Sequence, residues 1–246
     1  MAAIPCLFCG RASDSKEHYI PQWLSKASGR QGETILKGAA KDGVLQSAKE
    51  HGTATEAFEK NLCQHCNNTL GNLLENPVSA LLKPLMAGDF SAAGSFTNDR
   101  RQLIAWWALL HALEHDFLEN RLDKGPKDQL LALFGQLIAG NNPALPVDAR
   151  VHFAKAGYSE FAFFLTKQLI DCNRGSVQAI GSFWWGMQAG HLILSVARMP
   201  NGARPAKGGG LSLWPVECGE VPTYEDIRYY HAASNIDTSL PARSTA

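Results

Sequence analysis

Four cysteines arranged as two C-x2-C pairs are the residues of this 246-residue chain with the most distinctive chemistry. The first pair is Cys6 and Cys9, and the second pair is Cys63 and Cys66. A two-residue spacer lets one tight turn present two sulfurs to the same ion, and four thiolates complete the tetrahedral shell of a structural zinc ion. The spacing therefore predicts a structural Zn²⁺ held by all four. The alternative is two unrelated turns with buried free thiols.

The two pairs are separated by 53 residues, from Gly10 to Leu62, which exceeds the spacing of a small zinc ribbon or finger. A folded segment must therefore lie between them, and it contains Glu17 and His18. A shared metal ion would bring these two residues close to Asn67, which directly follows the second pair.

Glu17, His18 and Asn67 together suit the metal-assisted hydrolysis of a phosphodiester bond. Histidine supplies a general base that works near neutral pH. A carboxylate and an amide oxygen are hard ligands that suit Mg²⁺ or Mn²⁺, and a divalent cation stabilises charge on the phosphate and the leaving oxygen. Away from the cysteine pairs, Glu17 and His18 would instead be interpreted as a surface acid beside a packed histidine.

The order of these motifs resembles the HNH endonucleases, in the zinc-stapled branch that includes phage endonuclease VII. The resemblance covers about residues 1–76 and depends on C-x2-C, then acid-His with a hydrophobic residue and proline, then N-L-C-x2-C-N. It implies that Glu17 and Asn67 bind a catalytic Mg²⁺ or Mn²⁺, that His18 is the general base, and that Asn61 steadies the loop carrying this base. Two departures are that Asp is commoner than Glu at position 17, and that the final histidine of the family is Asn67 here.

The charge balance argues against a protein that coats DNA through a global excess of positive charge. The chain has 23 basic and 23 acidic residues, so its formal net charge is zero. A nuclease needs only a local basic patch, for which Lys16, Lys26 and Arg30 are candidates. We expect DNA as the partner, with RNA as the alternative, and the oligomeric state is left open, a homodimer included.

The N-terminus and the apolar segments predict a cytoplasmic protein without a membrane partner. No charged segment followed by an apolar run begins the chain, so no signal peptide is expected. The most apolar helical stretch, Leu103 to Leu113, is too short to span a bilayer. In a reducing compartment, clustered cysteines indicate metal binding. Cys172 and Cys218 are predicted to be single buried thiols.

The patterns predict an α+β protein with several regions. A treble-clef ββα-metal unit of the HNH type occupies residues 1–76. A helical segment follows over 77–140, then an antiparallel β-rich part over 141–235 and a disordered tail over 236–246. Within the first region we expect a helical turn at 22–25, two short strands forming a hairpin within 28–56 with His51 in a loop, and a helix over 67–75 ended by Pro77.

Helical periodicity is strongest in the second region. Pro84 is expected to kink or split a helix there, and a long helix should run from Asp99, its N-cap, to about Asn120. Its apolar stripe comprises Leu103, Trp106, Trp107, Leu110, Leu113 and Phe117. Another helix should open at Pro126 and end at Gly140. His111 and His115 are four residues apart, a metal-ligand spacing on one helix face, but packed or surface histidines are the favoured interpretation.

Alternating hydrophobicity predicts strands in the third region. They are expected over residues 150–156, 160–170, 177–189, 191–197 and 211–216, with turns at Gly157, Gly175 and Gly190. Phe183, Trp184 and Trp185 could stack nucleic-acid bases, but aromatic strand residues are favoured as core.

Two alternative functions remain open. A non-catalytic zinc-knuckle module that binds nucleic acid or protein would share the cysteines without needing Glu17, His18 and Asn67 together. An interaction protein would use its C-terminal part, with the zinc unit serving only to fold it. The co-occurrence of the three polar residues favours the enzyme.

Overall fold

The structure is a computed structural model, and it describes residues 4–18, 20–29, 34–41, 44–53, 58–59, 61–91, 93, 96–119, 122, 124–167, 170–171, 177–178, 183–198 and 211–214. Helices and antiparallel strands together make an α+β fold, as predicted. Arg30, Cys172, Gly175, Cys218 and the tail over 236–246 lie outside the described residues.

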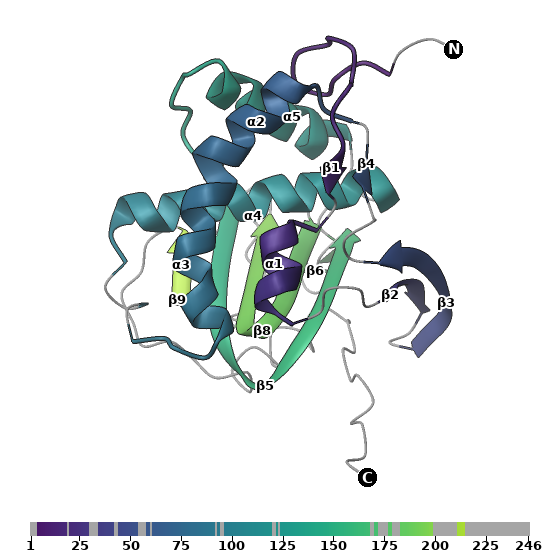
Figure 1. Ribbon diagram of the computed structural model, residues 1–246, viewed down its shortest axis with the longest axis vertical. Helices are drawn as coiled ribbons and strands as arrows, with labels where there is room; N and C mark the ends of the chain where they lie inside the picture. The colour runs from purple at the N-terminus through teal and green to yellow at the C-terminus, as the bar shows by residue number, and fades with distance from the viewer. Residues whose placement is uncertain are drawn as a thin grey trace.

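Two long antiparallel strands, β5 (Ala149–Lys167) and β8 (Phe183–Arg198), form the centre of the main sheet. The short strand β9 (Leu211–Trp214) pairs with the other edge of β5, so the strand order is β8-β5-β9. Figure 1 shows α4 (Asn98–Glu119) crossing the sheet, with α3 (Asn76–Met86) and α1 (Gln22–Ala27) nearby. The short strands β6 (Ile170–Asp171) and β7 (Val177–Gln178) form a separate antiparallel pair.

The predicted turns at Gly157 and Gly190 are wrong, because β5 and β8 each continue through these glycines. The buried core residues of β8 are odd-numbered from Phe183 to Ala189 and even-numbered from Leu192 to Val196. This change of face marks an irregularity in the strand pairing, because regular alternation keeps every second residue on one face. Gly190 lies at the change with a φ of 61°, and between the pairs Lys155–Leu192 and Glu160–Gly190 it is β5 that has the extra residues.

Gly190 is also required by packing. A Cβ atom at this position would lie 2.3 Å from the carbonyl oxygen of Met86. The end of α3 therefore approaches the strand at a distance that only glycine permits.

A single run of helix extends from Gln64 to Met86, where a helix ended by Pro77 was predicted. It comprises α2 (Gln64–Leu70), the π-helical turn η1 (Gly71–Glu75) and α3. A π turn interrupts the i→i−4 bonding pattern just before Pro77, which has no N–H to donate. Pro84 likewise lies inside α3 without splitting it.

The long helix α4 begins slightly earlier than predicted, because its N-cap is Thr97 and not Asp99. Thr97 Oγ1 accepts the N–H of Arg100 at 3.4 Å, the geometry of an N-cap. All residues from Ile104 to Leu113 are buried, so α4 is an internal helix instead of one with a single apolar stripe. The next helix, α5 (Lys124–Ile138), contains Pro126 in its first turn, and Gly140 follows its end with a φ of 82°.

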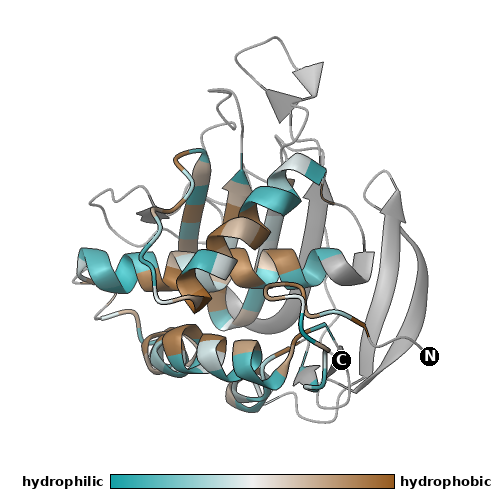
Figure 2. Ribbon diagram, turned by 90° about the horizontal axis from the view of Figure 1, so that it is seen from above, coloured by the Kyte–Doolittle hydropathy of each residue, from teal (hydrophilic) through white to brown (hydrophobic). Residues whose placement is uncertain are grey.

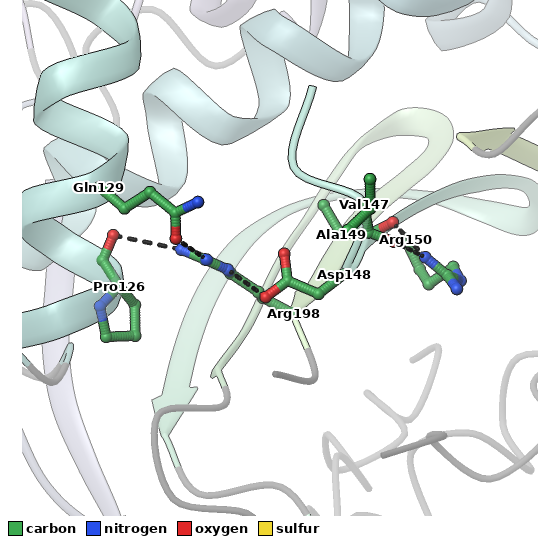
Figure 3. A network of polar contacts seen from close by, with 7 residues as sticks. All are labelled: Pro126, Gln129, Val147, Asp148, Ala149, Arg150 and Arg198. Carbon is green, nitrogen blue, oxygen red and sulfur yellow. Dashed lines mark hydrogen bonds and ion pairs between the residues drawn. The ribbon is translucent and has the colours of Figure 1, made fainter. Parts of the chain in front are cut away.

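Arg198, at the end of β8, joins the sheet to α5 (Figure 3). Its Nε donates to Asp148 Oδ2 at 3.0 Å, and its Nη1 donates to the carbonyl of Pro126 at 3.3 Å. Gln129 Oε1 accepts from Nη2. A buried guanidinium needs several acceptors, and these three each accept from a different nitrogen of it.

The N-terminal strands form two separate pairs. β2 (Thr34–Lys41) and β3 (Val44–Thr53) form the expected hairpin, with His51 in β3 instead of a loop. β1 (Glu17–His18) pairs with β4 (Phe58–Glu59). The predicted helical turn after Pro21 is α1.

One buried core contains residues from the cysteine segment, the helices and the sheet, among them Cys66, Leu82, Trp107 and Leu194. The boundaries proposed at residues 76 and 140 stay predictions. Figure 2 shows hydrophobic and hydrophilic residues mixed along the coloured helices. In the described part of the chain, no helix is both long and apolar enough to cross a membrane.

Candidate metal centre and active site

The two cysteine pairs meet in space, as their spacing predicted. The four Sγ atoms of Cys6, Cys9, Cys63 and Cys66 all lie within 4.8 Å of one another, and the Sγ atoms of Cys9 and Cys63 are 3.5 Å apart. Tetrahedral zinc with bonds of about 2.3 Å requires sulfurs about 3.8 Å apart. The cluster is therefore compatible with a structural metal ion such as zinc.

A tight turn presents the first pair. The N–H of Gly10 donates to the carbonyl of Cys6 at 2.9 Å, and the N–H of Cys6 donates to the carbonyl of Arg11 at 2.6 Å. Gly10 has a φ of 72°, which favours glycine, so the residue after the second cysteine closes this turn. The N–H of Leu7 donates to the carbonyl of Asn61 at 3.0 Å, which joins the two pairs through the backbone.

Residues 13–15 fasten the second pair to the segment that leads into β1. The hydroxyls of Ser13 and Ser15 donate to the carbonyl of Leu62 at 2.9 and 2.8 Å. Asp14 Oδ1 accepts the N–H of Gln64, the first residue of α2, at 2.8 Å. This contact gives α2 its cap, because the N-cap residue Cys63 forms no side-chain cap. The helix consequently begins at Gln64, earlier than predicted.

Arg11 is the positive group beside the thiol cluster. Its Nε donates to Cys9 Sγ at 3.4 Å, and hydrogen bonding with Arg11 lowers the pKa of the exposed Cys9 to about 6. Burial instead raises the pKa of Cys66. A nearby cation would therefore favour the thiolate of Cys66, whereas Cys9 ionises more readily beside the guanidinium.

The predicted catalytic residues lie on the elements joined by this cluster. His18 is half-buried in β1, and its Nε2 lies 2.9 Å from the amide nitrogen of Gln22. The backbone of Glu17 pairs with Glu59, and its side chain is outside the described part. Asn67 is half-buried in α2, and Asn61 is half-buried before the second pair. Their predicted roles stay predictions.

Other candidate residues separate into exposed and buried groups. Lys16 and Lys26 are exposed, in keeping with a candidate basic patch. Phe183 and Trp185 are buried, which confirms the core interpretation for those two rings.

His111 and His115 are both buried, and among the described residues only the four-cysteine group is arranged to hold a metal. His111 lies between Glu75 and Glu114, at 2.7 and 2.8 Å. Glu75 was missed by the sequence analysis, because nothing in its local pattern marks a partner on another helix.

A scan against protein-family models, a search of curated proteins and a search of solved structures each find no match to this chain. A functional assignment therefore rests on the residues of the chain and on their geometry.

Proposed function

We propose that this chain is a metal-dependent endonuclease of the HNH type, which hydrolyses phosphodiester bonds in nucleic acid, with DNA as the expected substrate. The observation that carries this proposal is the four-cysteine cluster. It joins residues 13–15, which lead directly into Glu17 and His18, to the helix that contains Asn67.

The arrangement supports a zinc-stapled ββα unit. A short antiparallel pair, β1 with β4, is followed by the second cysteine pair and then by α2. A structural Zn²⁺ held by the four thiolates would make the ends of this unit rigid, and Arg11 would offset part of the negative charge of the complex.

His18 is the proposed general base, which accepts a proton from the attacking water. The amide nitrogen of Gln22 can only donate, so Nε2 of His18 carries the lone pair in this state. A water molecule must take the place of Gln22 to be activated at that atom.

Glu17 and Asn67 are the proposed ligands of the catalytic cation, because a carboxylate and an amide oxygen form the hard donor set that Mg²⁺ or Mn²⁺ prefers. When bound, such a cation stabilises negative charge on the phosphate and on the leaving oxygen. Asn61 would steady the segment before the second cysteine pair, where its carbonyl already accepts the N–H of Leu7.

Cleavage of supercoiled plasmid with Mg²⁺ or Mn²⁺, and its loss in EDTA, tests the proposal. His18→Ala should lower the cleavage rate by roughly 10²–10⁴-fold, the usual contribution of a general base. His65→Ala is the matched control, since His65 is an exposed histidine between the cysteines of the second pair. Wild-type cleavage by a folded His18→Ala protein would reject His18 as the general base, whereas a wild-type protein that cleaves nothing would leave the non-catalytic zinc module.

A further inference from the structure

The carboxylate of Glu75 collects N–H donors from two other helices. Its Oε2 accepts the indole N–H of Trp23 in α1 at 2.6 Å. Its Oε1 accepts the indole N–H of Trp107 at 2.7 Å and lies 2.7 Å from Nε2 of His111, both in α4. An indole N–H can only donate, so both tryptophans depend on this one carboxylate.

His111 completes the cluster as a buried cation. Its Nε2 faces Glu75 and its Nδ1 faces Glu114 Oε2 at 2.8 Å, and both ring nitrogens can donate only in the protonated form. Burial alone would lower the pKa of His111, but the charges of Glu114 and Glu75 outweigh it and raise that pKa to about 10. The rings of Trp107 and Trp185 flank the imidazole, with centroids at 4.3 and 6.4 Å. The cation holds Glu75 in place against α4.

The position of Glu75 in the chain connects the two halves of the proposed active site. It is the last residue of η1, in the same run of helix that begins at the second cysteine pair and contains Asn67. Its partner Trp23 directly follows Gln22, which contacts His18. Glu75 therefore joins the segment that holds His18 to the helix that holds Asn67.

We propose that Glu75 is a positioning residue for phosphodiester cleavage: through Trp23 it fixes α1, and so keeps Gln22 and His18 in register with the helix that carries Asn67. This inference rests on the proposed function. Glu75 contacts neither water nor phosphate in this role, and it acts through α1.

Two pairs of variants test it. Glu75→Gln should lower kcat by about 10–100-fold with KM changed by less than about 3-fold, because a displacement of about 1 Å at a reacting group has such an effect. Trp23→Phe, which removes the indole N–H together with the five-membered ring but keeps an aromatic side chain, should lower kcat similarly. The double variant should lower kcat no further than either single variant, since both act through one contact.

Glu114→Gln is the matched control. It removes the other carboxylate from His111 but leaves Glu75 bonded to Trp23, so kcat of the folded protein should stay within about 3-fold of wild type. Glu75→Gln should also shift the NMR signals of the Gln22 side-chain amide and the His18 ring, and Glu114→Gln should not. This readout needs no cleavage.

The outcomes separate the two proposals. Active protein in which Glu75→Gln and Trp23→Phe both retain wild-type kcat overturns the positioning role and leaves the nuclease intact. NMR signals of Gln22 and His18 that do not respond to Glu75→Gln overturn it independently of activity. A wild-type protein that cleaves no nucleic acid overturns the proposed function, and the proposed role of Glu75 in cleavage is then overturned as well.

Discussion

The thiol cluster and the Glu75–His111–Glu114 cluster belong to the same core, but they differ in where a positive charge would come from. The thiol cluster consists of cysteines from two sequence motifs, and four thiolates there would need a cation from outside the chain. The second cluster draws its members from η1 and α4, and it carries its own cation in His111. The two cysteine pairs are visible as local motifs, whereas a cluster that pairs charges from separate helices is visible only after folding.

The largest effect should come from removing a ligand of the thiol cluster. Cys63→Ser should abolish stoichiometric zinc and disorder the segments around both cysteine pairs, because structural zinc sites contribute on the order of 10 kcal/mol to folding. Elemental analysis and NMR spectra would show this. Cys218→Ser is the control, as a cysteine that belongs to neither C-x2-C pair, and it should retain the zinc. Folded Cys63→Ser protein without metal would show that the cluster is a set of packed thiols.

The second cluster should break when its cation is removed. His111→Leu leaves Glu75 and Glu114 facing each other without a positive charge, and breaking a buried pair costs about 3–5 kcal/mol. Thermal or urea unfolding measures the loss. Zinc content should be unchanged, in contrast to Cys63→Ser. Stability equal to wild type would mean that the cluster contributes nothing net.

Stability should also depend on pH through His111. Its pKa is raised above the usual value, to about 10, so its contribution is complete below about pH 6.5 and is lost as the pH rises toward 10. The slope can reach about 1.4 kcal/mol for each pH unit. Glu114, whose pKa burial raises, changes stability in the same direction. Unfolding of wild type and His111→Leu at pH 7, 8 and 9 should converge, and parallel curves would contradict this.

The smallest effect should follow from changing the surroundings of the metal without changing a ligand. Arg11→Ala removes the donor to Cys9 and should weaken zinc affinity by about 10-fold, as outer-shell changes do. Competition with a chromophoric chelator measures the affinity. Lys16→Ala, another exposed cation on the same segment, should leave the affinity near wild type. An unchanged zinc affinity in Arg11→Ala would show that the guanidinium has no influence on the metal site.

Short-range patterns determined much of the fold before any tertiary contact was known. The C-x2-C spacing predicted a four-thiol cluster, since a two-residue turn constrains two sulfurs wherever it occurs. Apolar periodicity predicted α4 and α5 to within a few residues, and alternation predicted extended structure over most of β5 and β8, although it divided each of them at a glycine. Each of these features depends on residues only a few positions apart.

The tertiary structure decided features that depend on distant partners. Gly190 was predicted as a turn and instead lies within β8, where the end of α3 packs against it. The helix continues past Pro77, because the preceding π turn changes the backbone bonding pattern where Pro77 has no N–H to donate. Glu75 accepts from Trp23 and Trp107, which lie 52 and 32 residues away. No local pattern encodes such pairs, because packing alone brings an isolated carboxylate to its donors.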